Sequence, residues 1–229
     1  MDELNEYEQY LAYATQELSR NGNKKICQTQ DHPSAEILRE FEDVLSSAKE
    51  EKPLQEFLTR HPEMLVQQLG AGCRWVIPKP QLGGKLEPDF MVGRIDSGGL
   101  RWVAIELESP AVESLFTKSN GTPGEKLRQG IQQVKDWRHW IENNLQTARN
   151  SPRSGGCGLF GVTPRIDGMV FIGRREVTRE DDQRHRHEIA WDQRIQVHTY
   201  DWLLEEARKL LPLHRATVED CEECDRYGR

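Results

Sequence analysis

Apolar residues recur at helical spacing through the amino-terminal third of the chain. The spacing predicts a helix over residues 2–20, then a polar linker, RNGNKKICQTQDHPS, and a second helix that begins after Ser34, a good N-cap residue. A third helix over residues 54–61 ends before Pro62, and a fourth over residues 63–70 ends at Gly70. We therefore expect this part of the chain to be mostly helical.

From residue 74 onward the pattern becomes typical of β-strands. Segments rich in aromatic and β-branched residues, separated by Pro and Gly, cover residues 74–82, 87–93 and 100–108. Thr122 is expected to be the N-cap of a helix that runs to about Asn143, because Pro123 and Glu125 complete a capping-box pattern. Two further strands, residues 167–174 and 194–199, precede an amphipathic helix over residues 201–211.

This order of elements predicts an α/β (α+β) fold with a mixed central β-sheet flanked by helices. We expect a helical N-terminal extension and linker over residues 1–33, one main domain over residues 34–212, and an acidic C-terminal tail over residues 213–229.

Composition narrows the class of protein. The net charge is -7, charged residues make up 30% of the chain, and no segment reaches the roughly 20 apolar residues that a membrane-spanning helix needs. A soluble, cytoplasmic protein without a membrane partner is expected, since the amino terminus is acidic and has no secretion signal. The 5 cysteines, an odd number, argue against a disulfide framework and fit a reducing compartment.

Cys221 and Cys224 form the only C-x-x-C motif. A structural zinc site needs four ligands, and His214 is the only other candidate nearby in the sequence. We therefore interpret this segment as a solvated acidic tail and keep zinc binding as the less favoured alternative.

Three acids stand out in the predicted hairpin, LEPDFMVGRIDSGGLRWVAIELESP. Whether the turn contains Ser97 and Gly98 alone or four residues, the pairing brings Asp89 opposite Glu106. Glu108 lies on the same face, because side chains alternate along a strand. Like charges at this spacing destabilise a ladder unless a cation or a proton is shared.

A divalent ion such as Mg²⁺ or Mn²⁺ would remove this repulsion. The alternative is a solvated face on which the acids are merely exposed. Trp102 and Ala104 share the face with the acids and favour a covered one. In the following helix, Gln133 lies beside Gly130 and could orient a water or a phosphate, although a helix-boundary amide without a function fits the pattern equally well.

The order of these motifs resembles the PD-(D/E)XK nuclease superfamily: PDF, then a strand ending in ELE, then a helix with QV-DW. Within it, the chain resembles the C-terminal nuclease domain of the Shedu family of bacterial anti-phage proteins, with further similar segments in LQEFLTRHPEML, ELESP, VFIGR and VHTYDWLL. The resemblance covers roughly residues 50–211. It implies a restriction-endonuclease-like core and possible self-assembly into a homo-oligomer.

The resemblance also implies roles for single residues. Asp89, Glu106 and the main-chain carbonyl of Leu107 would bind Mg²⁺ or Mn²⁺, and Gln133 would support the site. The family's usual lysine is replaced by Glu108, which could bind metal or act as a general base for water. An additional helical acid, Glu56 or Glu63, would complete the site.

Arg174 and Arg175 follow the VFIGR strand and are candidates for binding the DNA backbone. A run of arginines is more often a solvated face, and that alternative stays open.

We thus expect a metal-dependent DNA endonuclease of anti-phage defence. The main alternative is a DNA-binding or sensing module that has lost catalysis. Glycoside hydrolysis by paired acids is disfavoured, because no aromatic platform for sugars is evident.

Overall fold

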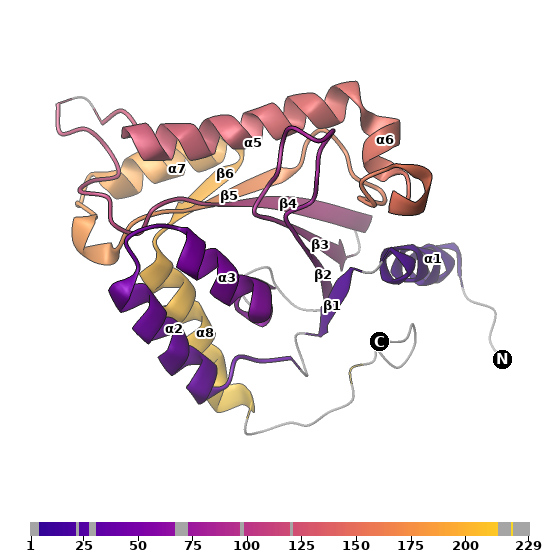
Figure 1. Cartoon of the computed structure of the whole chain (residues 1–229), viewed down its shortest axis with the longest axis horizontal. Helices are drawn as coiled ribbons and strands as arrows, with labels where there is room; N and C mark the ends of the chain where they lie inside the picture. Colours follow the sequence, from indigo (N-terminus) through magenta and orange to yellow (C-terminus); the bar gives the residue numbers. More distant parts are fainter. Residues whose placement is uncertain are drawn as a thin grey trace.

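The computed structural model describes residues 5–21, 23–27, 31–66, 73–96, 99–119, 121–214 and 221. These residues form a six-stranded sheet in the order β1-β2-β3-β4-β5-β6 (Figure 1). The strands β1 to β4 are antiparallel, whereas β4, β5 and β6 run parallel. The predicted mixed sheet with flanking helices is confirmed.

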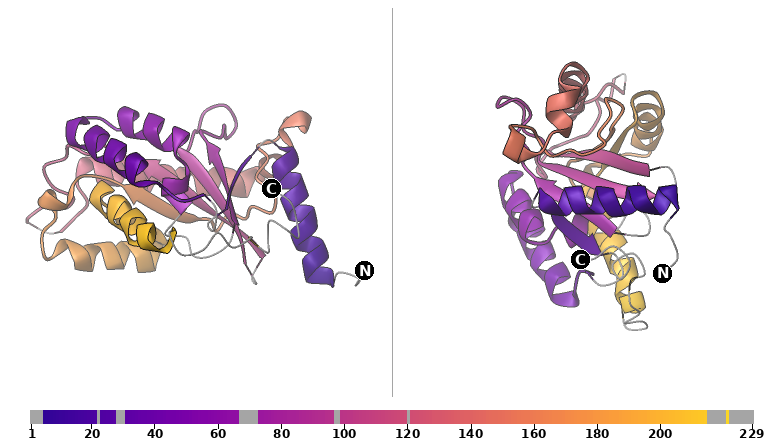
Figure 2. Two further views of the ribbon diagram at one scale, coloured as in Figure 1. Left: turned by 90° about the horizontal axis from the view of Figure 1, so that it is seen from below. Right: turned by 90° about the vertical axis from the view of Figure 1, so that its right-hand side faces the viewer.

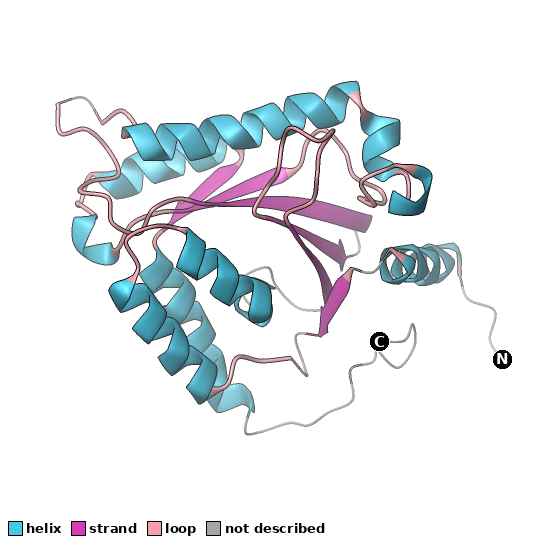
Figure 3. Cartoon of the chain, in the orientation of Figure 1, coloured by secondary structure: helices cyan, strands magenta, loops and turns pink. Residues whose placement is uncertain are grey.

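The strands are short and the helices surround them (Figure 3). The strands are β1 (Lys24–Cys27), β2 (Cys73–Pro78), β3 (Phe90–Asp96), β4 (Gly99–Leu107), β5 (Asp167–Phe171) and β6 (Ile195–His198). The α-helices are α1 (Glu6–Arg20), α2 (Ala35–Ser47), α3 (Lys52–Arg60), α4 (Glu63–Val66), α5 (Glu125–Asn143), α6 (Leu145–Arg149), α7 (Asp182–Gln193) and α8 (Tyr200–His214).

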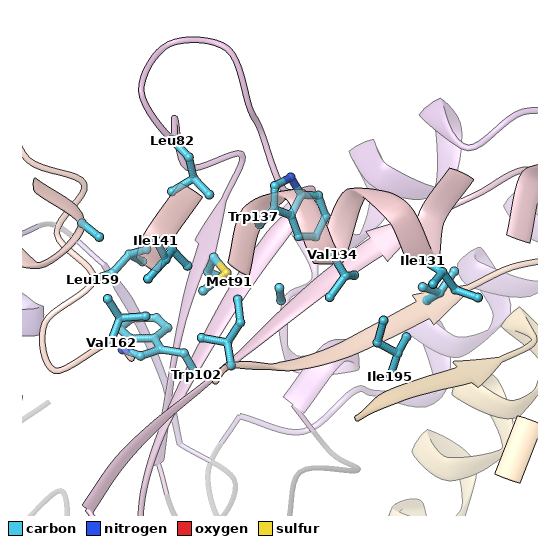
Figure 4. Packing of buried hydrophobic residues seen from close by; sticks show 14 of the residues in the cluster. Leu82, Met91, Trp102, Ile131, Val134, Trp137, Ile141, Leu159, Val162 and Ile195 are labelled. Carbon is cyan, nitrogen blue, oxygen red and sulfur yellow. The ribbon is translucent and has the colours of Figure 1, made fainter. Parts of the chain in front are cut away.

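Two layers of helices cover the sheet. Helices α5 and α7 lie on one face and α2, α3 and α8 on the other (Figure 1). Under α5, apolar side chains of the helix pack onto the sheet, as Val134, Trp137 and Ile141 do beside Met91 and Trp102 (Figure 4). The apolar stripe predicted for this helix is therefore its buried face.

Helix α1 lies across the end of the sheet at which β3 turns into β4 (Figure 2). The Tyr10 hydroxyl accepts a hydrogen bond from the Leu100 backbone N–H at 3.4 Å, and the Tyr13 ring meets Phe160 edge-on. No helix among the described residues combines the length and the apolar run needed to cross a lipid bilayer.

The hairpin has the predicted register, since Phe90 pairs with Ile105 and Ile95 with Leu100. The predicted turn residues Ser97 and Gly98 and the predicted C-cap Gly70 lie outside the described residues.

The linker prediction was wrong for residues 24–27. They form β1, the edge strand, in which Ile26 and Cys27 are buried and pair with Arg74 and Cys73 of β2. Only two of its four residues are buried, so the sequence contains no alternation long enough to indicate a strand.

The start of α5 was also predicted wrongly. Its N-cap is Gly124, and Thr122 instead bonds with Thr117 in the preceding loop, with 3.0 Å between their hydroxyl oxygens. The backbone N–H of Gly124 donates to the Leu115 carbonyl, so the loop decides where the helix begins.

Helix α7, between the parallel strands β5 and β6, was missed. Within it only Asp182 and Ile189 are buried, so it has no apolar stripe. Tertiary contacts position it instead: Arg179 binds the Asp182 carboxylate and donates to the Phe116 carbonyl at 2.7 Å.

Candidate functional site

Three carboxylates gather where β3 begins and β4 ends. Glu106 and Glu108 are 6% and 5% exposed, and Asp89 is half-buried. The alternative of a solvated face is wrong for the two glutamates, because α5 covers them. Burial of three neighbouring acids is costly, so the arrangement requires a compensating group.

Helix α5 holds the two glutamates from above. The Gln133 amide donates a hydrogen bond of 2.5 Å to Glu106 Oε1. One turn earlier, a Cβ at position 130 would lie 3.2 Å from Glu108 Cγ, so Gly130 gives Glu108 room beneath the helix. The predicted pairing of a polar contact with an adjacent glycine is present, and Gln133 is not merely a boundary amide.

Asp89 lies one residue before β3 and therefore just outside the ladder. Its Oδ2 accepts a hydrogen bond from the Leu107 backbone N–H at 2.8 Å. In an extended strand the N–H and C=O of a residue point to the same side, so the Leu107 carbonyl also points toward Asp89. The Leu107 side chain packs in the opposite apolar layer.

A fourth acid, Glu51, approaches from the start of α3. Ser109 Oγ donates to the Lys49 carbonyl at 2.9 Å, which ties the loop before α3 to the end of β4. The charge of Glu51 contributes to raising the pKa of Asp89, Glu106 and Glu108. The position of Glu51 near the acids depends on this loop contact, and no local pattern in the sequence indicates it.

The predicted helical acids have other surroundings. Glu56 has a 64% exposed side chain and pairs with Lys52 at 3.9 Å. Glu63 lies 3.1 Å from His61 Nδ1. The acid whose charge raises the pKa of the site carboxylates is Glu51, the residue before α3, and completion of the site by Glu56 or Glu63 stays a prediction.

Burial is the main cause of the altered acidity at this site. It raises the pKa of Glu106 strongly, and the charges of Asp89 and Glu108 add to the effect. Burial also raises the pKa of Asp89, although the hydrogen bond from the Leu107 N–H lowers it. Burial likewise raises the pKa of Glu108, to about 7, although the positive charge of Lys126 lowers it. Near neutral pH the three carboxylates therefore share at least one proton unless a cation binds in its place.

One cation already reaches the acids. Lys126 Nζ, from the first turn of α5, lies 3.8 Å from Glu108 Oε2, and the lysine side chain is 50% exposed. Sequence reasoning missed Lys126, because its relation to Glu108 depends on how α5 crosses the strand. An ammonium group from a neighbouring element thus lies beside the acid at position 108.

The donor set fits a hard divalent cation. Glu106 Oε2 is buried and has no hydrogen-bond donor among the described residues. The three acids do not bring their oxygens within 4.8 Å of one another. Among the described residues, only a group of three cysteines elsewhere in the structure has its ligand atoms that close together. The acids would therefore bind an ion as a pair, Asp89 and Glu106, completed by the Leu107 carbonyl and by water.

A groove of about 890 Å³ opens beside Asp89. Its lining mixes acids with three cations that could contact phosphate: Glu51, Lys52, Gln55, Glu56, Thr59, Arg60, Pro78, Lys79 and Asp89.

The two predicted DNA-binding arginines follow β5, and the loop that carries them begins beside the end of β4, because the Gly173 N–H donates to the Ser109 carbonyl at 3.1 Å. Arg174 is held by Asp201 at 2.9 Å and Arg175 pairs with Glu205, both acids belonging to α8. A DNA phosphate would have to replace these partners, and DNA contact through the two arginines stays a prediction.

The acids, Gln133 and the helices around them lie within one segment that matches a known family. No curated protein matches the chain. Residues 48–204, from the end of α2 into α8, match the family model described as Shedu protein SduA, C-terminal. The chain therefore belongs to the Shedu family.

Proposed function

We propose that this protein is a metal-dependent DNA endonuclease with a role in defence against phage. The observation that carries the proposal is the buried Glu106 Oε2, which has no hydrogen-bond donor among the described residues and lies beside two further carboxylates. Family membership supports the defence-related role. DNA as substrate and Mg²⁺ or Mn²⁺ as cofactor are parts of the proposal.

In this function, Asp89, Glu106 and the Leu107 carbonyl would hold the ion. Bound Mg²⁺ or Mn²⁺ supplies a more acidic water and neutralises charge on the phosphate. Gln133 fixes the orientation of Glu106 through its 2.5 Å hydrogen bond to Oε1, which leaves Oε2 available as the atom that would bind the ion.

Glu108 and Lys126 divide the task that one lysine performs elsewhere in the superfamily. Glu108, with a pKa of about 7, accepts the proton of the attacking water near neutral pH. Lys126 stabilises negative charge on the phosphate as the water attacks, since its ammonium lies 3.8 Å from Glu108 and is half exposed.

The test is incubation of the protein with supercoiled plasmid and with linear duplex DNA, in buffers containing Mg²⁺ or Mn²⁺. We expect cleavage with the parent and none with Asp89→Asn. Glu142→Gln, which removes an exposed acid at the far end of α5, is the matched control and should cut like the parent. Intact DNA under all conditions, or an active Asp89→Asn, would refute the proposal.

A second function keeps DNA binding but not cleavage. It is favoured by one observation, the acidic residue at position 108 in place of the usual lysine. Calorimetry separates the two: the nuclease binds Mn²⁺ and loses that binding in Glu106→Gln, whereas the binding module takes up DNA without metal at these acids.

A further inference from the structure

Three cysteine thiols from distant parts of the chain meet in the structure. The Sγ atoms of Cys27, Cys73 and Cys221 all lie within 4.8 Å of one another, and Cys73 and Cys221 are 3.8 Å apart. The three residues are 3%, 0% and 8% exposed and form a buried cluster of their own. Cys221 is therefore not part of a solvated tail, contrary to the sequence interpretation.

The sheet edge brings two of these thiols together. Cys27 ends β1, Cys73 begins β2, and the two are direct partners in the ladder. Asp31 holds Cys27 in place, because its carboxylate accepts from the Cys27 N–H and its own N–H donates to the Cys27 carbonyl, both at 2.7 Å. The cysteines are thus held by backbone structure rather than by chance contact.

The spacing suits a tetrahedral metal site. Zinc binds thiolates at about 2.3 Å, so two sulfurs of a tetrahedron lie about 3.8 Å apart. A disulfide would require about 2.05 Å and would use only two of the three sulfurs. The guanidinium of buried Arg74 donates to the Cys73 carbonyl at 2.8 Å and places a permanent positive charge beside the backbone of Cys73.

We propose that Cys27, Cys73 and Cys221 bind a structural Zn²⁺ ion. These three thiols supply three of the four ligands that a tetrahedral zinc site takes.

The site is separate from the acidic one. The residue pairs Arg74 with Arg94 and Pro78 with Phe90 show that Cys73 lies toward one end of the strands and Asp89 toward the other. The ion would cross-link the edge strand β1, strand β2 and the carboxyl-terminal segment. The ion would hold Cys221 against the sheet. Cys221 lies outside residues 48–204, the range that the family model matches.

The experiment measures zinc in the full chain, purified without chelators, by plasma mass spectrometry. We expect about one zinc per chain in the parent, released when a mercurial reagent modifies the thiols. Cys27→Ser and Cys221→Ser should each lower the zinc content about tenfold or more.

Cys157→Ser is the matched control. Cys157 is partly exposed and its Sγ donates to the Gln81 carbonyl at 3.3 Å, so its variant should keep all the zinc. Parent protein without zinc, zinc retained in both Cys27→Ser and Cys221→Ser, a Cys73–Cys221 disulfide, or iron in place of zinc would each overturn the proposal.

A second measurement covers variants that fail to fold. Replacing the metal of the parent with Co²⁺ should produce the thiolate-to-metal charge-transfer absorption and the intense visible bands of tetrahedral cobalt. Weak octahedral bands alone would contradict thiolate ligation.

Discussion

Along strand β4, alternate side chains enter two different environments. Val103, Ile105 and Leu107 face α2, α3 and α8 in a wholly apolar layer. Trp102 and Ala104 face α5, and the same row continues with Glu106 and Glu108. Both rows are buried, with Ile105 at 0% and Glu106 at 6% exposure.

The two rows therefore differ in chemistry and not in burial. Removing the apolar row from water stabilises the fold, by about 25 cal/mol for each Å² buried. Burying the acids disfavours their charged forms and raises their pKa values. Acids with raised pKa values cluster at functional sites, so one face of β4 provides stability and the other, at its carboxyl end, provides the candidate site.

The largest expected effect is the loss of activity in Glu106→Gln. We expect DNA cleavage to fall about 1,000-fold, equivalent to about 4 kcal/mol, because one of two metal-binding carboxylates is lost. The amide oxygen can still accept from Gln133, so the fold should persist and the free energy of unfolding at pH 8 should rise by about 1 kcal/mol. The cleavage rate and the free energy of urea unfolding at pH 8 are measured for the variant and the parent. A loss of stability with unchanged cleavage would show that Glu106 stabilises the fold and does not serve the site.

The neighbouring residue on the other face should behave in the opposite way. Ile105→Ala removes buried methyl groups and should lower the free energy of unfolding by about 2–5 kcal/mol through a cavity. The fraction of the Ile105→Ala variant that remains folded should still cleave DNA in the presence of the metal. Urea unfolding measures the change, and a value below about 1 kcal/mol would show that this face is not the stabilising one.

The third effect is a stability that depends on pH and on the divalent ion. The folded-state pKa values of Glu106 and Glu108 are raised above 4.5, that of Glu108 to about 7. The folded state therefore binds more protons than the unfolded state, and stability falls as pH rises through this window. We expect higher stability at pH 5 than at pH 8 in metal-free buffer.

Mg²⁺ or Mn²⁺ at 100 times its dissociation constant should restore about 2.7 kcal/mol at pH 8. The gain should be smaller at pH 5, where protons occupy the carboxylates. Thermal unfolding with and without the ion tests this, with Glu106→Gln as the control that shows no metal-dependent gain. Equal melting temperatures for the parent with and without the ion at pH 8 would count against a metal site.

The smallest effect is expected for Lys126→Met. Removing the ammonium near Glu108 should lower cleavage about 10- to 100-fold and raise the pKa of Glu108 further. The rise of the rate that follows deprotonation of Glu108, on the acidic limb of the profile, then moves to higher pH. Lys135→Met, on an exposed position further along α5, is the matched control and should leave both unchanged. A pH–rate profile identical in the two variants would remove Lys126 from the mechanism.

Prediction from sequence succeeded where the signal was local. The register that pairs Phe90 with Ile105 follows from alternation and turn position, and the buried stripe of α5 follows from helical periodicity. It failed for β1 and α7. Both elements bury too few side chains to show a period, and contacts with other segments decide their structure.

By itself, the sequence determined the hairpin, the acids Asp89, Glu106 and Glu108 along it, and the family to which the chain belongs. Only the tertiary structure decided that Glu51 and Lys126 approach these acids and that three separated thiols meet. The physical reason is that periodicity encodes which face of an element is buried, whereas electrostatic and ligand contacts depend on distances between elements far apart in the chain.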